Sequence, residues 1–258
     1  MNAVERAAGL WLHRLLVRLP RAHAELLNQY RSSEDFAKRF PRTVCAELLA
    51  DGPLKAKYRK HQADEQRHER AYAARIRKLG GEPQAVDVAR DYLLQTWREA
   101  SAAGVGVPYA RFHDPRPLDR TERMRLWAFQ TVVEERGLIE MAAHAAACTR
   151  DQATLDLLES ITPDERHHAE YSRRALDDAA EEVPAQGAQE ARALIETMRQ
   201  AEDRAYRRVT LALLGALRAG PLTEASWLER RIVWLFEVVT RASVRETRGA
   251  LEPASAAW

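Results

Sequence analysis

The chain has 258 residues, of which 46% are apolar, so it can bury a core large enough for one large domain, or a domain with an appendage, without disulfides. Its two cysteines, Cys45 and Cys148, lie in apolar, alanine-rich stretches, which predicts buried thiols in a reducing compartment and excludes a four-cysteine zinc or rubredoxin module. Its 40 basic and 38 acidic residues nearly balance, so composition gives no indication of a nucleic-acid partner.

The first predicted element is a helix over residues 3–18, which ends before Pro20. Charged residues interrupt its apolar stretch, so it lacks the continuous apolar core of a signal peptide. The longest charge-free apolar run in the chain, residues 209–217, is far too short to cross a bilayer. We therefore expect a soluble, cytoplasmic protein without a membrane partner.

The rest of the chain is also predicted to be helical, because apolar residues recur at spacings of three and four and no stretch alternates with a period of two for long. A helix over 22–50 is expected to kink at Pro41, and the next helix, over 54–79, is expected to stop at two glycines. Further helices are predicted over 84–102, 119–148, 152–179, 187–218 and 222–250, with a loop rich in glycine and proline over 104–117.

The order of these helices predicts an all-α fold in which two helical hairpins are joined by a long crossover over 81–118. Four-helix bundles with one long crossover have this connectivity. The chain then divides into an N-terminal helix over 1–20, the bundle over 21–182, and a C-terminal extension of two further helices over 183–258 that packs on the bundle.

Two Glu-x-x-His motifs, Glu65/His68 and Glu165/His168, lie one hundred residues apart, each in the second helix of a hairpin. Residues three apart share one face of a helix, so each motif can offer a carboxylate oxygen and an imidazole nitrogen to the same metal ion. A single motif of this kind would be expected by chance in a chain of this composition. The two copies are informative because their surroundings match.

Both motifs are preceded by an aspartate, Asp64 and Asp164, and both have a glutamate 31 residues upstream, Glu34 and Glu134. The pattern of an upstream glutamate followed by the motif therefore occurs twice. This is an internal repeat of candidate ligands.

Height above the hairpin turn selects among the upstream glutamates, because a helix rises about 1.5 Å per residue. By this rise Glu65 lies about 20 Å above the turn near residue 52, Glu34 about 26 Å and Glu47 only about 7 Å. Glu34 is therefore the expected partner of the first motif. In the second hairpin Glu134 and Glu135 stand at nearly the same height, and we prefer Glu134 because it preserves the repeat.

Four glutamates and two histidines on four facing helices match the ligand set of dimetal carboxylate bundles. The stretches HQADEQRHERAYAARIRKLGG, VVEERGLIEMAAH and TPDERHHAEYSRRAL resemble the dimetal members of the ferritin-like superfamily, such as rubrerythrin, the ribonucleotide reductase small subunit, multicomponent monooxygenases and tRNA-modifying di-iron hydroxylases. The resemblance covers residues from about 22 to 180. It implies six metal ligands: Glu34, Glu65, His68, Glu134, Glu165 and His168.

The resemblance also implies that each ligand histidine donates a hydrogen bond to an aspartate of the opposite motif, which fixes the ring tautomer and orientation. Asp64 would support His168, and Asp164 would support His68. The alternative is that both aspartates are ordinary solvated residues.

Other side chains near the motifs are candidates for supporting or catalytic roles. His61 and Tyr72 share the ligand face of their helix, at spacings of four from Glu65 and His68. We interpret His61 as a hydrogen-bonded core histidine, with a seventh ligand or a proton relay as alternatives. Tyr72 and Tyr30 are expected to pack in the interior with satisfied hydroxyls, or to act in radical or hydrogen-bonding roles near the metals. His167 points about 100° away from the ligand face, so it is expected behind the ligands or at the surface.

The expected cofactor is a pair of iron ions, with manganese or a mixed manganese/iron pair as alternatives and zinc as a redox-silent occupant. A reduced di-iron centre activates dioxygen, so the first hypothesis is a hydroxylase-type oxygenase or oxidase. It would act on a small organic substrate and take electrons from a reductase or a ferredoxin.

A second hypothesis is a ferroxidase or a rubrerythrin-like peroxidase that handles iron. The helices beyond the bundle and the loop over 104–117 favour the enzyme with an organic substrate. Retention of all six candidate ligands argues against a third hypothesis, a metal-free interaction module.

The basic residues of the helix over 54–79 are interpreted as a solvated face, with RNA such as tRNA as a minor alternative. The C-terminal helices would close the pocket or form a homodimer interface.

Overall fold

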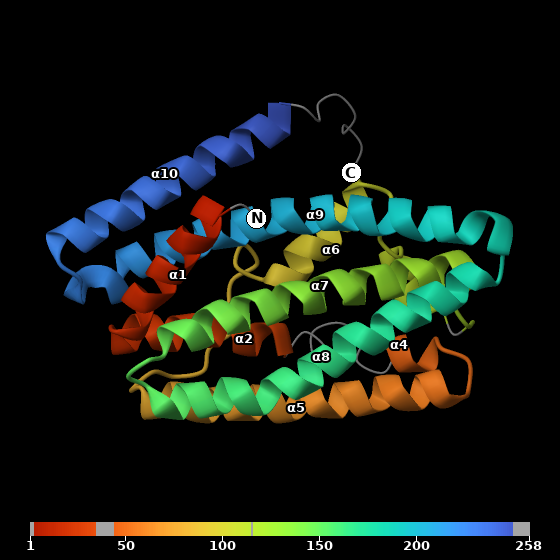
Figure 1. Cartoon of the computed structure of the whole chain (residues 1–258), viewed down its shortest axis with the longest axis horizontal. Coiled ribbons are helices and arrows are strands. Elements are labelled where there is room, and N and C mark those ends of the chain that lie inside the picture. Colours follow the sequence, from red (N-terminus) through yellow and green to blue (C-terminus); the bar gives the residue numbers. More distant parts are fainter. Residues whose placement is uncertain (1–2, 35–43, 115, 250–258) are drawn as a thin grey trace.

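A computed structural model describes residues 3–34, 44–114 and 116–249, which form helices joined by turns and loops and contain no strand (Figure 1). The predicted all-α class is confirmed for this part of the chain. No helix within it is both long enough and apolar enough to span a membrane.

The N-terminal helix α1 (Ala3–Val17) closely matches the prediction, and α2 (Pro20–Glu34) begins two residues earlier than expected. Proline suits the first turn of a helix because its fixed φ is already helical and its missing N–H needs no partner there. The kink predicted at Pro41 lies outside the described residues. The short helix α4 (Val44–Glu47) ends three residues before the predicted boundary at residue 50.

Helix α5 (Pro53–Lys78), which carries the first motif, agrees with the prediction to within one residue. It ends where Gly80 adopts a φ of 79°, in the left-handed region that glycine enters without strain. The N–H of Gly81 then donates back to the carbonyl of Ile76 and closes the last turn.

The crossover differs from the prediction, because the helix expected from residue 84 begins only at Tyr92 (α6, Tyr92–Ala102). The Asp91 carboxylate caps its first turn. The segment before it forms neither a helix nor a strand and is bound to α2, where Asn28 accepts from the N–H of Gln84 and Arg31 donates to its carbonyl. Side chains of α2 therefore form the hydrogen bonds that the backbone N–H and carbonyl of Gln84 would otherwise have made within a helix.

The second hairpin consists of α7 (Arg120–Ala147) and α8 (Gln152–Glu181), close to the predicted limits. Helix α8 turns directly into α9 (Pro184–Ala219), and the turn requires glycine at residue 187, because a Cβ there would lie 1.8 Å from the Ala180 carbonyl oxygen. A 3₁₀ turn, η2 (Pro221–Glu224), leads to α10 (Trp227–Gly249). Another, η1 (Tyr109–His113), lies within the loop predicted over 104–117.

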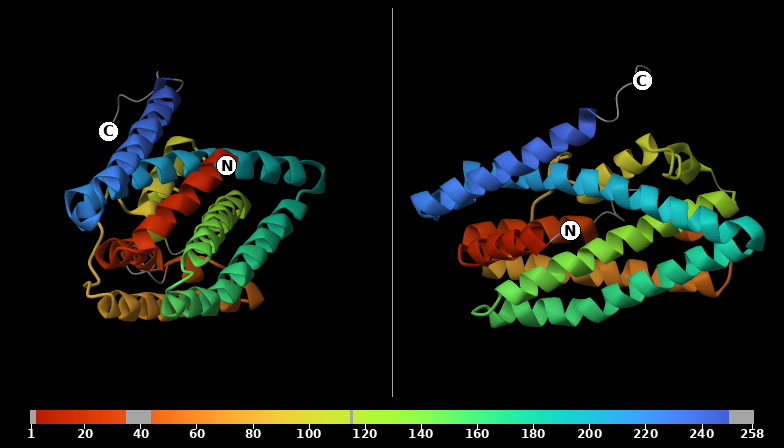
Figure 2. Two further views of the ribbon diagram at one scale, coloured as in Figure 1. Left: turned by 60° about the vertical axis from the view of Figure 1, so that its left-hand side comes forward. Right: turned by 45° about the horizontal axis from the view of Figure 1, so that its top comes forward.

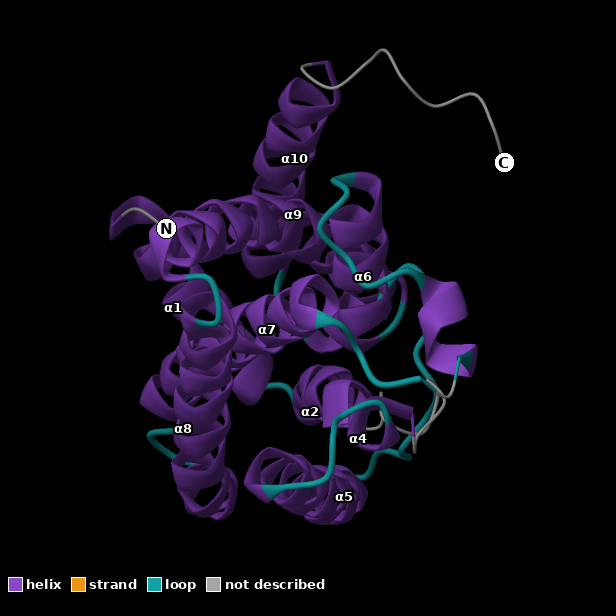
Figure 3. Cartoon of the chain, turned by 90° about the vertical axis from the view of Figure 1, so that its right-hand side faces the viewer, coloured by secondary structure: helices purple, strands orange, loops and turns teal. Residues whose placement is uncertain are grey.

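Helices α2, α5, α7 and α8 surround the candidate ligands. Helix α2 packs along α5, α7 packs along α8, and α5 also meets α8 (Figure 3). Helix α1 packs on α7 and α2, whereas α9 lies across α6, α7 and α8.

Helix α10 packs mainly on α9 and extends away from the rest of the chain (Figure 2). It exposes large apolar side chains: Trp227, Leu228, Trp234, Leu235 and Val238. The homodimer interface expected from the C-terminal helices stays a prediction.

Candidate metal centre

The two Glu-x-x-His motifs face each other across the interior between α5 and α8. Nδ1 of His68 lies 2.9 Å from Oε1 of Glu165, and Nδ1 of His168 lies 3.2 Å from Oε1 of Glu65. Each histidine therefore reaches the glutamate of the opposite motif. Both histidines are only 1% exposed, so these contacts lie in the interior of the protein.

The upstream glutamates join the motifs from α2 and α7. Oε2 of Glu34 lies 3.5 Å from Nδ1 of His68, and side-chain atoms of Glu34, Glu65, His68 and Glu165 all lie within 4.8 Å of one another. Glu134 forms a similar group with Glu165 and His168. Glu165 belongs to both groups, and Glu65 also lies beside His168, so the two motif glutamates are shared between the two halves of the cluster.

The competing glutamates lie elsewhere. Glu47 is half-exposed and forms ion pairs with Lys55 and Arg59. Glu135 is on the outer face of α7 and pairs with Arg199 at 2.8 Å. Height above the turn selected Glu34 in the first hairpin, and the repeat selected Glu134 in the second hairpin. These are the glutamates that the structure brings to the motifs.

The cluster contains buried polar atoms that lie close to one another but form no hydrogen bond of good geometry. They are Oε2 of Glu34, Oε1 of Glu65, Oε1 of Glu165 and the Nδ1 atoms of His68 and His168. Buried polar atoms are rarely left unpaired in proteins, and here the unpaired atoms point at one another. A pair of cations between them would satisfy these atoms, so the donor set fits a dimetal centre.

Electrostatics within the cluster also favour bound cations. The pKa of Glu34 and that of Glu134 are raised well above the usual range, because both side chains are buried and face other carboxylates. Burial lowers the pKa of His168, but the carboxylates of Glu165 and Glu65 outweigh burial and raise it to about 11. The metal-free cluster thus holds protons that balance its negative charge, and metal ions would displace them.

The aspartates before the motifs lie behind the opposite histidines. Nε2 of His168 lies 3.5 Å from Asp64, and Nε2 of His68 lies 3.4 Å from Asp164. Arg67, which the sequence did not single out, joins the two aspartates with hydrogen bonds of 2.7 and 2.6 Å. Since each histidine turns Nε2 to an aspartate, Nδ1 is the nitrogen presented to the cluster.

His61 also points into the cluster. Its Nε2 lies 3.0 Å from Oε1 of Glu65 and 3.5 Å from Oε1 of Glu134, while Nδ1 lies 2.5 Å from the hydroxyl of Tyr171. Its ring stacks on that of His168, with centroids 3.6 Å apart. Sequence reasoning missed Tyr171, although it follows His168 by three residues and so shares its helix face.

The remaining residues considered in the sequence are two tyrosines, His167 and the two cysteines. Tyr72 is buried and its hydroxyl donates to the sulfur of Met141, and Tyr30 packs edge-on against its ring with 5.9 Å between centroids. His167 is exposed on α8. Cys148 is a buried free thiol, whereas the side chain of Cys45 lies outside those described.

Replacing Asp64 by asparagine should destabilise the metal-free protein by about 2 kcal/mol at pH 7. Burial raises the pKa of Asp64, but hydrogen bonds from Lys60 and Arg67 outweigh burial and lower it from 3.8 to about 2. A carboxyl with a depressed pKa stabilises the fold fully above 3.8, and this contribution is lost as the pH falls towards 2.

Urea unfolding of wild-type and Asp64→Asn protein should therefore give a difference that shrinks by roughly half between pH 7 and about pH 3. Asp177→Asn, at an exposed position on α8, is the matched control and should cost less than about 1 kcal/mol. A pH-independent difference for Asp64→Asn would contradict the expected contribution of its charge.

The cluster opens into a large cavity of about 1130 Å³ between α1, α2, α5, α6, α7, α9 and α10. Its wall is mostly apolar, with leucine, valine, tryptophan and phenylalanine side chains. Candidate ligands line one part of it: Glu34, Glu65, Glu134 and Glu165, with His61 beside them. A molecule in this cavity would therefore lie against the candidate metal centre.

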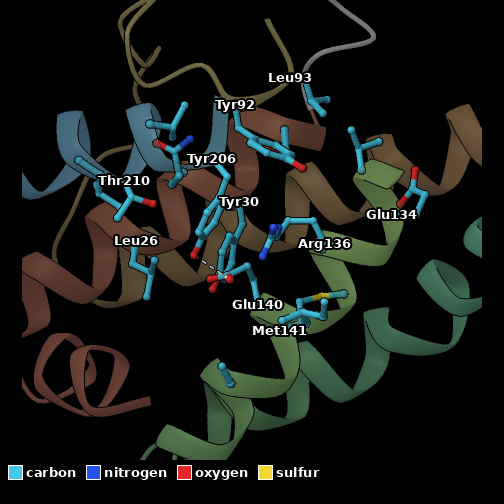
Figure 4. A pocket seen from close by; sticks show the side chains of 18 of the residues that line it. Leu26, Tyr30, Tyr92, Leu93, Glu134, Arg136, Glu140, Met141, Tyr206 and Thr210 are labelled. Carbon is cyan, nitrogen blue, oxygen red and sulfur yellow. Dashed lines mark hydrogen bonds between the residues drawn. The ribbon is translucent and has the colours of Figure 1, made fainter. Parts of the chain in front are cut away.

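Several polar groups of the cavity wall form hydrogen bonds, and Figure 4 shows the one between Tyr206 and Glu140. Arg136 donates to both carboxylate oxygens of Glu202 at 2.8 and 2.9 Å, and Tyr92 donates to the same carboxylate. The hydroxyl of Tyr206 donates to Glu140 at 2.8 Å. These partners lie far apart in the sequence, so no local pattern could have identified the wall.

Comparisons with known proteins add no family to these observations. No protein-family model, curated protein or solved structure matches the chain.

Proposed function

We propose that the chain is a ferritin-like dimetal carboxylate protein that uses dioxygen to oxidise an apolar organic molecule. The observation that carries this proposal is that the buried carboxylate and imidazole cluster forms part of the wall of an apolar cavity. In this proposal α2, α5, α7 and α8 are the four bundle helices, residues 81–118 are the crossover, and α1, α9 and α10 are additions that enclose the cavity.

The metal pair would be held by the six residues of the repeated pattern: Glu34, Glu65, His68, Glu134, Glu165 and His168. Carboxylate oxygens and imidazole nitrogens suit iron or manganese better than metals that prefer soft ligands. When bound and reduced, a di-iron pair would supply the dioxygen chemistry, with electrons from a reductase or a ferredoxin.

The protein's own residues would keep the reacting region dry and handle protons. The apolar wall excludes water, which strengthens electrostatic interactions inside the cavity. His61 lies between Glu65 and Tyr171, within 3.0 and 2.5 Å of their oxygen atoms. An imidazole in this position can hold a proton at Nδ1 or at Nε2 and so exchange it between the hydroxyl and the carboxylate.

The charges on the wall favour a substrate that is neutral or carries hydrogen-bond donors. The two arginines of the wall are paired with acids, Arg136 with Glu202 and Arg207 with Asp203. Glu140 accepts from the Tyr206 hydroxyl and adds a carboxylate to those of the cluster. Since both wall arginines already bind acids, neither is available to neutralise an anionic substrate.

A ferroxidase or a rubrerythrin-like peroxidase is the second candidate, because the same cluster would serve either chemistry. Neither requires a cavity of this size beside the metals. The cavity therefore favours the oxygenase or oxidase.

Anaerobic addition of ferrous iron tests the proposal. We expect about two irons per chain and an absorbance that develops only when oxygen is admitted. With a reductant and a neutral apolar probe such as indole, oxygen consumption should be accompanied by formation of an oxidised product. Rapid multiple-turnover oxidation of iron without any organic product would favour the ferroxidase instead, and loading well below two irons would exclude both.

A further inference from the structure

A second cluster of side chains that can bind a metal lies at the C-terminal end of α7, beside the turn into α8. His23 comes from the first turn of α2, and His144 and Cys148 come from the last turn of α7 and its C-terminal cap. All three are buried, with exposures of 0%, 0% and 1%. His144 follows Glu134 by ten residues, which places it roughly 15 Å along the helix from the carboxylate cluster.

The three side chains converge on one point. The Nε2 atoms of His23 and His144 lie 2.9 Å apart, and an atom of each residue lies within 4.8 Å of Sγ of Cys148. His144 and Cys148 are four residues apart and so share a helix face. Nδ1 of His23 lies 3.4 Å from Oδ2 of Asp151, which Arg75 holds through both carboxylate oxygens at 2.7 Å.

Without an ion this arrangement leaves buried polar atoms unsatisfied. Only one proton can lie between the two Nε2 atoms, and Nδ1 of His144 has no hydrogen-bond partner. Nδ1 of His23 lies 3.4 Å from Asp151 but forms no hydrogen bond with it. The surroundings combine apolar and polar side chains. Leu27 and Leu158 belong to the same core cluster as Cys148, and the rings of His13 and Tyr30 lie 5.6 and 5.5 Å from that of His144 between centroids. Burial lowers the pKa of His23 to about 4, so its imidazole is neutral, as a metal ligand requires. Burial also raises the pKa of the Cys148 thiol to about 12, so a bound cation would have to displace its proton.

We propose that His23, His144 and Cys148 form a mononuclear site for a borderline-soft divalent cation of the zinc class, separate from the carboxylate centre. Two imidazole nitrogens and one thiolate suit zinc, whereas iron and manganese in carboxylate centres take mainly oxygen ligands. A water molecule would complete the tetrahedron. The site would tie the start of α2 to the turn between α7 and α8.

Protons balance as follows when the ion binds. Cys148 loses its thiol proton to solvent, and the imidazole that carries its proton on Nε2 moves it to Nδ1, so that both Nε2 lone pairs face the metal. Nδ1–H of His23 then points at Asp151, as in carboxylate–histidine–metal triads. The two Nε2 atoms need to separate only from 2.9 Å to roughly 3.3 Å, the spacing that tetrahedral Zn–N bonds of about 2.05 Å give.

Cobalt(II) added to the chelator-treated full-length chain tests this site. Cobalt bound to a thiolate shows a strong charge-transfer band in the near ultraviolet, and the carboxylate centre, which has no sulfur ligand, cannot produce it. We expect the band to saturate at one equivalent per chain. Excess zinc should abolish the band by displacing the cobalt.

Two cysteine variants locate the thiolate, and Glu165→Ala and His23→Asn serve as further tests. Cys148→Ser should lose the band and one metal equivalent, whereas Cys45→Ser, the only other cysteine variant available, should retain both. Glu165→Ala should keep the band while the carboxylate centre loses its ions, so failure of the proposed function leaves this result intact. His23→Asn, which keeps the thiol, should weaken cobalt binding at least 10-fold and serves if Cys148→Ser fails to fold. Absence of the band in the wild type, or its persistence in Cys148→Ser, would overturn the proposal.

Discussion

Glu165→Ala should reduce metal loading of the carboxylate centre from about two ions per chain to less than one. Glu165 belongs to both groups of candidate ligands and contacts both motif histidines, at 2.9 Å for His68 and 3.4 Å for His168. Its removal therefore deprives both metal positions of an oxygen ligand. Metal analysis after anaerobic loading and desalting measures the loss directly.

The same variant should lose the stabilisation that metal confers. A ligand that binds only the folded state at a concentration 1,000 times its Kd stabilises that state by about 4 kcal/mol. We expect a gain of this order for wild-type protein in chemical unfolding with ferrous iron, and almost none for Glu165→Ala.

Glu135→Ala is the matched control for this experiment. It removes a glutamate from the neighbouring helix α7, but one whose side chain is 38% exposed and paired with Arg199. It should load two ions and gain stability as the wild type does. Equal metal content in Glu165→Ala and Glu135→Ala would show that the cluster is not a metal centre.

Gly137→Leu should block oxidation of the organic substrate while leaving the metal centre loaded. Gly137 lies on α7 in the cavity wall, and a Cβ built there meets no atom within 4 Å, so the leucine side chain would occupy cavity space. We expect kcat/KM for the organic substrate to fall at least about 10-fold, which corresponds to about 1.4 kcal/mol of lost transition-state stabilisation. Product formation and iron content are measured on the same preparation.

Gly215→Leu provides the control. Gly215 lies on α9, is exposed and also leaves room for a Cβ, but it does not line the cavity. Both substitutions replace a helical glycine and should stabilise their helices by up to about 1 kcal/mol, so a difference in activity reports on the cavity alone. If Gly137→Leu oxidised the organic substrate as fast as Gly215→Leu does, the cavity would not be the substrate site.

Much of the carboxylate cluster could be anticipated from the sequence because its geometry is local. The spacing of three places Glu165 and His168 on one face, and the rise per residue places Glu34 near Glu65 without knowledge of the other hairpin. The limits of α5, α7 and α8 were also accessible, since proline, glycine and capping aspartates mark their ends.

Features that depend on which helices face one another could not be anticipated. Periodicity defines the buried face of a single helix but does not identify the helix that covers it. The pairing of Arg136 with Glu202 joins α7 to α9, and the meeting of His23 with His144 joins α2 to α7. The helix predicted from residue 84 was wrong for the same reason, because α2 supplies hydrogen-bond partners for the backbone of the segment before α6.

The repeat that relates the two motifs is broken at one position, and the break makes the two halves of the cluster chemically different. One hundred residues after His61, the corresponding residue is Ile161, which lies in the apolar core. Only the half that contains His168 therefore has an additional imidazole stacked against it. In the proposed dimetal centre the two metal positions would therefore have different neighbours, because His61 would lie beside only the position that His168 helps to form.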